Sequence, residues 1–213
     1  MKRPETPKPP PGNAPVVPMT NLLLRLLGVA AAVLGLSGLT AGFSEHRAAR
    51  ENTSLPLVLG AGAMARTHFR TAGRYALDVS VGFRRDRGVP PDQLDELTLA
   101  TEGPLDVAWR VRQRGVELAA GNSRRDRLGF FGTPDRQGVV IGRFKPPAAG
   151  TYEIETHVGQ TLAALEATEP TLRIATGPAE AQRAGFRAVV CTLIGVVLVG
   201  LGGLLLARAF KTS

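Results

Sequence analysis

Residues 188–207 have the sequence AVVCTLIGVVLVGLGGLLLA, which contains no charged side chain. A helix of this length rises about 30 Å, which matches the hydrocarbon thickness of a lipid bilayer. Arg187 precedes the stretch and Arg208 follows it, so a cation stands at each expected water boundary. The sequence therefore predicts a transmembrane helix at 188–207 and a short cytoplasmic tail at 208–213.

A second apolar segment lies at residues 21–43, and it carries no charge from Leu26 onward. Its length favours a retained transmembrane helix, because the apolar core of a secretory signal peptide spans only about 7–15 residues. Cleavage as a signal peptide is the alternative, since basic residues precede the segment and residues 40–42 approximate a small-x-small cleavage site. We expect the helix to be retained.

Small residues recur along one face of this first helix. With a spacing of three and four residues, the stripe consists of Gly28, Ala31, Gly35, Gly38 and Gly42. A face without bulky side chains lets a second helix approach closely. In the second apolar segment we expect the matching face at Gly195, Gly202 and Gly203. The two helices are therefore predicted to pack against each other.

Two membrane spans place both termini on the same side of the membrane. The first tail, residues 1–20, contains seven prolines and is predicted to be disordered. Both tails are short and basic, and such tails stay in the cytoplasm, whereas a long domain translocates largely regardless of its charge. We therefore expect a two-pass protein of the plasma (inner) membrane, with an extracytoplasmic domain at residues 45–178.

Residues 45–178 show the apolar alternation of half-buried β-strands. The clearest run is formed by Leu105, Val107, Trp109 and Val111. Strands are predicted at 55–59, 75–81, 96–100, 105–111, 116–120, 139–145, 152–158 and 171–176, and one helix at 160–167. Short strands separated by Gly and Pro are typical of an all-β fold. We predict an antiparallel β-sandwich of the jelly-roll or Ig-like type, inserted between two transmembrane α-helices.

One local pattern occurs twice in this domain. An aromatic residue ends one strand, a turn with Gly follows, and a tyrosine begins the next strand. The two copies contain Phe69, Gly73 and Tyr75, and Phe144, Gly150 and Tyr152. We expect both tyrosines to point inward. The pattern is widespread in sandwich and jelly-roll domains, including carbohydrate-binding modules, and indicates no single family.

The familiar signatures of catalysis and cofactor binding are absent from the sequence. Gly60, Gly62 and Ala65 imitate a dinucleotide-binding fingerprint, but Gly73 interrupts the helix that such a site needs. We expect a Gly-rich loop there and no cofactor. The three histidines are scattered, so no metal site is predicted. The net charge of +8 is divided between the tails and a domain surface of mixed sign, which argues against nucleic acid as a partner.

The most unusual polar feature is the tetrapeptide Arg-Arg-Asp-Arg, which occurs at 84–87 and again at 124–127. Guanidinium groups bind phosphate and carboxylate in a bidentate manner. If the fold brings both loops to one rim, they could bind an anionic lipid head group, a glycan phosphate or an acidic partner. The candidate residues are Arg84, Arg85, Arg87, Arg124, Arg125 and Arg127. The sequence favours the simpler interpretation, a solvated turn with internal Arg–Asp pairing.

Together these features favour a non-catalytic binding or scaffold component of a membrane or envelope assembly. Its expected partners are the lipid bilayer and other membrane or envelope proteins. The alternative is a membrane-anchored enzyme or ligand sensor whose site lies in the loops 84–95 and 122–137. A deep pocket lined by two or more carboxylates would favour the enzyme, whereas a flat sandwich with an exposed apolar or basic face would favour the binding protein.

Overall fold

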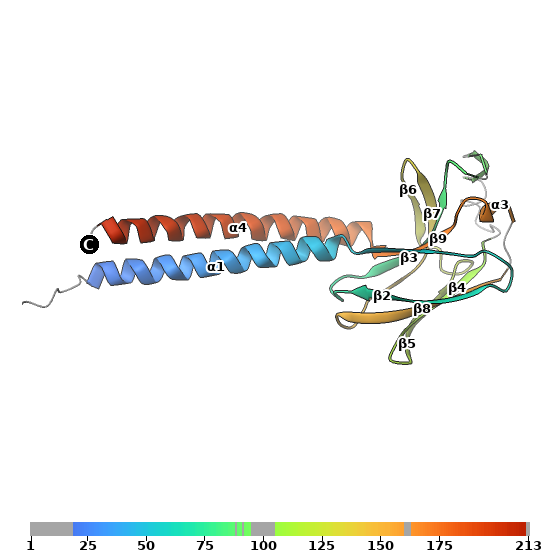
Figure 1. Ribbon diagram of the computed structural model, residues 1–213, viewed down its shortest axis with the longest axis horizontal. Helices are drawn as coiled ribbons and strands as arrows, with labels where there is room; N and C mark the ends of the chain where they lie inside the picture. Colours follow the sequence, from blue (N-terminus) through green and yellow to red (C-terminus); the bar gives the residue numbers. More distant parts are fainter. Residues whose placement is uncertain (1–18, 88, 91, 95–104, 160–162, 212–213) are drawn as a thin grey trace, which may run out of the picture. The chain divides into compact units, whose positions relative to one another are not determined.

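The computed structural model describes residues 19–87, 89–90, 92–94, 105–159 and 163–211. These residues fall into two compact units. The helix unit contains the described residues of Met1–Gly42 and Val189–Ser213, and the β unit is Phe43–Ala188. Figure 1 shows the order of the elements along the chain.

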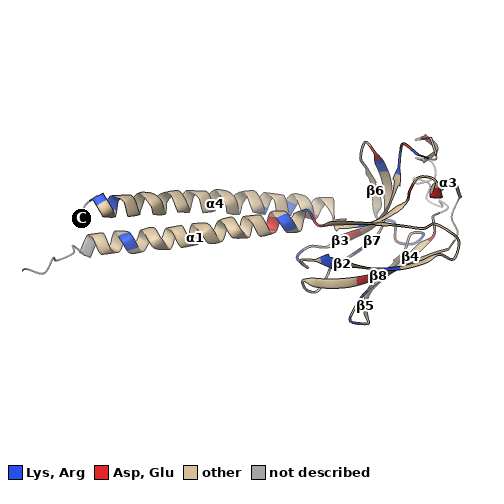
Figure 2. Cartoon of the chain, in the orientation of Figure 1, with Lys and Arg blue, Asp and Glu red and all other residues tan. Residues whose placement is uncertain are grey.

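Two long helices flank the strands, α1 (Met19–Ala49) and α4 (Pro178–Lys211). Both are longer than the predicted spans at 21–43 and 188–207, because each continues into the β unit. Pro178 suits the start of α4, since its fixed φ is helical and the first helical amide lacks a partner in any case. By length and composition, both helices could cross a membrane. The middle of each helix is free of Lys, Arg, Asp and Glu (Figure 2).

Within the helix unit, α1 and α4 pack through glycines. A Cβ atom added to Gly35 would stand 2.7 Å from the carbonyl oxygen of Gly195, and one added to Gly202 would stand 2.7 Å from that of Gly28. Gly38 also contacts α4 at Gly195, while Gly42 is buried and Ala31 is half-buried. The backbones therefore approach so closely that only glycine fits.

Gly203 does not share this contact face. It is exposed, and a Cβ atom there would have no neighbour within 4 Å. The prediction that Gly203 lies on the same helix face as Gly195 is therefore wrong, and helix geometry explains why. A step of seven residues, to Gly202, nearly completes two helical turns, whereas a step of eight rotates the side chain by roughly a further 100°.

The strands of the β unit form two antiparallel sheets, which confirms the predicted strand-dominated, antiparallel architecture. The first sheet contains, in spatial order, β1 (Asn52–Pro56), β9 (Thr171–Thr176), β3 (Leu77–Arg84), β7 (Arg136–Phe144) and β6 (Gly129–Gly132). The second contains β2 (Met64–Thr71), β8 (Gly150–Val158), β4 (Val107–Gln113) and β5 (Val116–Asn122). One hydrophobic core takes side chains from both sheets.

Strand β4 buries Val107, Trp109 and Val111 and exposes Arg110, as its alternation predicts. Strand β3 differs from the half-buried strand predicted at 75–81, because it is buried on both faces. It lies in the middle of the five-stranded sheet, where its outward Asp78 is covered by an ion pair with Arg143 of 2.6 Å. The central position of β3 and the ion pair of Asp78 therefore bury the face that the alternating sequence pattern predicts to be exposed.

Several boundaries differ from the sequence predictions. The strand predicted at 55–59 is β1, which ends at Pro56, and a turn follows at Gly60, where the amide of Ala63 donates to the Gly60 carbonyl at 2.8 Å. Of β2, only the end near Phe69 was predicted, through the aromatic-turn pattern, and β6 was not predicted. Within the predicted helix at 160–167, the described residues contain α3 (Ala163–Glu166). The strand predicted at 96–100 lies outside the described residues.

The repeated aromatic-turn pattern contributes to the core. Phe69, Phe144 and Tyr152 form one aromatic cluster, with ring centroids 5.8–6.4 Å apart. The Tyr152 hydroxyl donates to the Ala148 carbonyl at 2.6 Å, which satisfies it inside the core. Tyr75 is also buried, in a separate small cluster with Ala48 and Ala184. Both tyrosines thus point inward.

Candidate functional site

The arginines of the first Arg-Arg-Asp-Arg loop, residues 84–87, interact with side chains of the chain itself. Arg84 forms ion pairs with Asp86 at 2.5 Å and with Glu169 at 3.2 Å, and Arg87 also pairs with Glu169. The hydrogen bond from Arg84 lowers the pKa of the Asp86 carboxyl. Arg85 donates to the side chain of Gln137 at 2.8 Å. Two of the three arginines are therefore already neutralised by carboxylates.

The second loop lies at the same end of the two sheets, where β8 passes to β9, but on the opposite sheet. Arg124 faces Asp106 at 3.6 Å. Arg127 donates to the Ser123 carbonyl at 3.0 Å, and burial lowers its pKa. Arg125 is exposed. Each loop thus has its own carboxylate, Glu169 for the first and Asp106 for the second.

The outer face of the four-stranded sheet carries a ladder of ion pairs. Glu153 faces Arg66 at 3.3 Å and His68 at 3.6 Å, and Glu155 faces Arg112 at 3.0 Å. Such half-exposed pairs contribute little to stability and leave few donors for a ligand. Over the described ranges, no group of three His, Cys, Asp or Glu side chains is placed to hold a metal ion.

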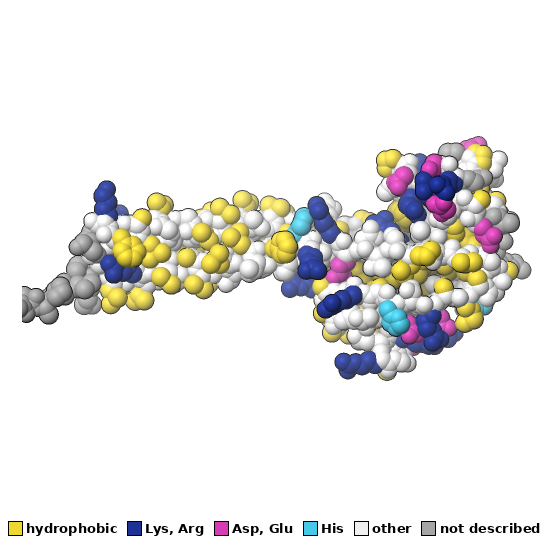
Figure 3. All heavy atoms as spheres, in the orientation of Figure 1, with side chains coloured by type: hydrophobic (Ala, Val, Ile, Leu, Met, Phe, Trp, Pro, Cys, Tyr) yellow, Lys and Arg dark blue, Asp and Glu magenta, His cyan; other side chains and the backbone are white. Residues whose placement is uncertain are grey.

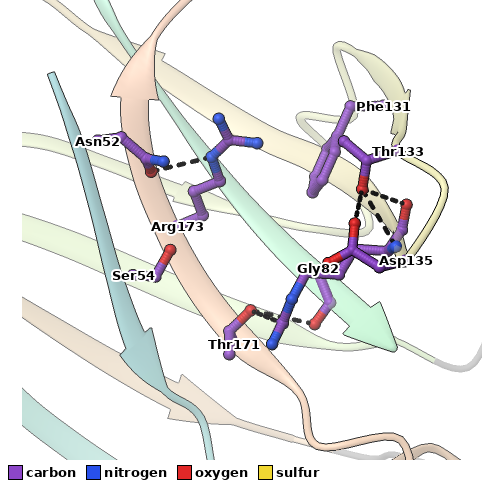
Figure 4. Close-up of a pocket in the computed structure, with 9 residues that line it drawn as sticks. Asn52, Ser54, Gly82, Phe131, Thr133, Asp135, Thr171 and Arg173 are labelled. Carbon is purple, nitrogen blue, oxygen red and sulfur yellow. Dashed lines mark hydrogen bonds between the residues drawn. The ribbon is translucent and has the colours of Figure 1, made fainter. Parts of the chain in front are cut away.

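The outer face of the five-stranded sheet is different, because it forms an open groove of about 320 Å³. We call it the sheet groove (Figure 4). Its lining residues are Asn52, Ser54, Gly82, Phe131, Thr133, Asp135, Arg136, Thr171 and Arg173. They come from all five strands of the sheet and from the turn between β6 and β7.

Glycines open the space in which the groove forms. A Cβ atom added to Gly138 would stand 2.3 Å from the Phe131 ring, and one added to Gly82 would stand 3.2 Å from it. The ring therefore lies directly on the backbone of β7 and β3. The guanidinium carbon of Arg173 stands 5.4 Å from the centroid of Phe131, in cation–π contact.

Two half-buried arginines supply the donors of the sheet groove. Arg173 donates through Nε to Asn52 Oδ1 at 3.0 Å, and Arg136 donates through Nη1 to Thr171 Oγ1 at 2.9 Å. These bonds fix both side chains in place. The two terminal nitrogens of Arg173 and the Nη2 of Arg136 make no hydrogen bond with any residue that the structure describes. Neither arginine forms an ion pair with a described carboxylate.

One carboxylate, Asp135, lines the groove. Its pKa is lowered, because Thr133 Oγ1 donates to it at 2.8 Å and its own backbone amide and the nearby charge of Arg136 add to the effect. Asp135 therefore stays ionised near neutral pH and can accept hydrogen bonds. With the arginines, it gives the groove donors of positive charge and one fixed acceptor.

Sequence reasoning missed this groove because its residues are far apart along the chain. Asn52 and Arg173 meet only through the pairing of β1 with β9, where Asn52 lies opposite Ala175. A weak signal was present, since Arg173 lies between the buried residues Leu172 and Ile174 of a predicted strand and must point outward. Nothing in the sequence shows which strands place their outward residues beside it.

No protein-family model matches this sequence. No curated protein matches it. Among solved structures, a protein from Sulfurospirillum deleyianum aligns with 60% of this chain and 98% of its own chain, at 11% sequence identity and a TM-score of 0.43.

Proposed function

We propose that this chain is a two-pass protein of the plasma membrane whose β unit, outside the cytoplasm, binds an acidic glycan of the cell envelope without catalysis. The observation that carries the ligand class is the pair Arg136 and Arg173 in the sheet groove. Both side chains are positioned by hydrogen bonds and keep donors that no described carboxylate uses.

An acidic sugar matches the groove in charge and in shape. A carboxylate on the sugar ring would accept from the free nitrogens of Arg173 or Arg136, in charge-assisted hydrogen bonds. Sugar hydroxyls would donate to Asp135 and accept from Asn52. The open, shallow form of the groove suits a segment of a polymer better than a small molecule, which is normally enclosed.

The membrane part of the proposal is supported by the surface of the helix unit. Hydrophobic side chains are spread over its exterior (Figure 3). Two examples of large exposed ones are Leu34 and Val197, which are 61% and 66% exposed. In water such an exterior would be a large aggregation-prone patch, whereas in lipid it is the expected surface. The basic tails support an outward β unit through the positive-inside rule.

The strand order supports a jelly roll rather than an Ig-like sandwich. The chain alternates between the five-stranded and the four-stranded sheet from β1 to β4. It alternates again from β7 to β9, since β7 and β9 lie in the five-stranded sheet and β8 lies in the four-stranded sheet. Repeated crossing between two sheets is typical of Greek-key and jelly-roll connections. Jelly rolls present broad sheet faces, and in a jelly roll the sheet groove would lie on one of them.

The enzyme or sensor alternative would use the same region. Thr133, Asp135 and Arg136 belong to the loop 122–137 in which that alternative placed a site. The sheet groove, however, is lined by a single carboxylate of lowered pKa, and a general acid needs a raised pKa near the working pH. The lowered pKa of Asp135 therefore supports ligand binding rather than acid catalysis.

The test is a titration of the full chain in detergent with an oligogalacturonate, using a neutral maltooligosaccharide of equal length as the control ligand. We expect binding of the acidic sugar alone. Each charge-assisted hydrogen bond is worth about 1.5–3 kcal/mol, so the double variant Arg136→Gln/Arg173→Gln should raise Kd at least about tenfold. The matched variant Arg110→Gln/Arg125→Gln removes equal charge elsewhere and should leave Kd within about twofold. Equal binding of the neutral sugar, or equal effects of the two variants, would contradict the proposal.

A further inference from the structure

A second basic groove lies where α1 ends and β1 begins, and it shares the lining residue Asn52 with the sheet groove. We call it the collar groove. Its volume is about 700 Å³, and it is lined by the end of α1, the start of β1, the end of β2 and the turn before β8. Four arginines line it: Arg47, Arg50, Arg70 and Arg74. Figure 3 shows Lys and Arg side chains gathered on this end of the β unit.

Three of these arginines have side chains that are available to bind a ligand. Arg47, Arg50 and Arg70 are exposed, and their side chains make no hydrogen bond or ion pair with any residue in the described part of the chain. Arg74 is different, because it pairs with Glu45 at 2.8 Å and also donates to Ser44 at 3.2 Å. The groove therefore has one fixed cation and three available ones.

The carboxylate in the lining does not neutralise the three arginines. Glu51 accepts from the Thr71 hydroxyl at 2.6 Å and from the Ala72 amide at 2.5 Å. Both of its oxygens thus join the end of β2 to the short segment between α1 and β1. Counting Glu45 with Glu51 against the four arginines, the groove keeps a formal charge of +2.

Exposed aromatic side chains flank the same segment. Phe43 is 70% exposed and lies four residues before Arg47, so both side chains are on one face of α1, one turn apart. Phe186, on α4, is 71% exposed. Both rings are wholly apolar, and exposed apolar side chains of this size mark a surface that contacts lipid or a partner. Along α1, Arg47 stands about 6 Å beyond Phe43, roughly one headgroup layer.

We propose that the collar groove binds the phosphate of an anionic phospholipid from the membrane that α1 and α4 cross. Arg47 and Arg50 approach the headgroup from the helix end, and Arg70 approaches it from β2. The lipid is favoured over a free anion because Arg47 lies in the last turn of α1 and Arg50 directly follows the helix, so the proposed insertion of α1 would put both near headgroups. This inference rests on the proposed membrane insertion of the helices, but not on the ligand of the sheet groove.

The experiment uses the full chain in a mild detergent, with native mass spectrometry to count bound lipids. Dioleoyl-phosphatidylglycerol and dioleoyl-phosphatidylcholine are titrated separately, and inorganic phosphate is added as a competitor. Each Arg near a lipid surface contributes about a fivefold gain in affinity, so we expect at least about a tenfold preference for phosphatidylglycerol. The variant Arg47→Gln/Arg50→Gln/Arg70→Gln should lose the preference to within about twofold. The side chains of these residues make no hydrogen bond or ion pair with a described residue, so the variant should fold.

The matched variant Arg110→Gln/Arg124→Gln/Arg125→Gln removes three charges outside the collar groove and should keep the preference. Equal binding of the two lipids by the parent, or an unchanged preference in the collar variant, would overturn the proposal. Displacement of the lipid by an equal concentration of inorganic phosphate would overturn the assignment to a lipid. Carbonate extraction of membranes is run in parallel. A chain released by carbonate refutes the membrane insertion itself, whereas a retained chain without lipid preference refutes only this inference.

Discussion

The indole Nε1 of Trp109 donates a hydrogen bond of 3.0 Å to the carbonyl oxygen of Ile141. Trp109 belongs to β4 of the four-stranded sheet and Ile141 to β7 of the five-stranded sheet, so this bond joins the two layers through the core. A buried indole N–H needs a partner, and a mid-strand carbonyl of the opposite sheet supplies it. Trp109 thus fills space in the core with a large buried side chain and also links the two sheets directly by a hydrogen bond.

Truncation of Trp109 tests this role. We expect Trp109→Ala to lower the free energy of unfolding by roughly 3–5 kcal/mol, because it leaves a cavity and an unpaired Ile141 carbonyl. Arg110→Ala, on the exposed side of the same strand, should cost less than about 1 kcal/mol. Thermal midpoints of the full chain in detergent measure both. Tryptophan emission of the parent at water-like wavelengths, with equal midpoints for the two variants, would show that Trp109 is on the surface.

Gly142 makes room for the same indole. A Cβ atom there would stand 2.1 Å from Trp109 Cζ2, far inside van der Waals contact. Gly142→Ala should therefore destabilise the β unit by about 1–3 kcal/mol through overpacking. Gly132→Ala is the control, because its Cβ would meet only the end of the flexible Arg85 side chain at 3.7 Å. Similar denaturant midpoints for the two variants would contradict the packing of the indole against β7.

The prediction of Trp109 shows what the sequence could reveal. Its alternation with Val107 and Val111 is a local pattern, and local patterns suffice to orient side chains within one strand. The double burial of β3 was not predictable in this way, because it depends on β9 and β7 lying on either side. The sheet groove depends on the same non-local pairing. The Arg-Arg-Asp-Arg loops were visible in sequence, but their pairing with Glu169 and Asp106 required the fold.

The helix contact at Gly35 can be tested with a matched substitution. Gly35→Leu should lower the thermal midpoint of the helical circular dichroism signal in detergent, because the side chain would collide with the backbone of Gly195 and Val199. We expect a loss of about 1–3 kcal/mol. Gly200→Leu adds the same side chain to α4 where no atom lies within 4 Å, and it should be nearly neutral. If Gly200→Leu is as disruptive as Gly35→Leu, close approach of the two helices does not explain the effect, because leucine is the better helix former at both positions.

Tyr75 gives the β unit a pH dependence at high pH. Its hydroxyl donates to Glu45, and its pKa is raised chiefly by burial and then by Glu45, against a lowering effect of Arg187. Since the folded pKa exceeds the unfolded value near 10, the contribution of the protonated phenol is complete below about pH 10 and is lost as the pH rises through the folded pKa.

Tyr75→Phe should therefore cost about 1–3 kcal/mol at pH 7, where it removes a hydrogen bond to a carboxylate. The difference in stability between parent and variant should stay constant from pH 7 to 9 and shrink above pH 10. Urea unfolding at several pH values measures it. A difference that grows above pH 10 would mean that the folded state favours the ionised phenol.

The central claim is that α1 and α4 cross the membrane and hold the β unit outside the cytoplasm. Protease protection tests it directly, with a protease added to intact spheroplasts of an expressing bacterium and, separately, to inverted membrane vesicles. The account predicts that the β unit, Phe43–Ala188, is digested in spheroplasts and protected in inverted vesicles. Protection in spheroplasts with digestion in inverted vesicles would contradict it.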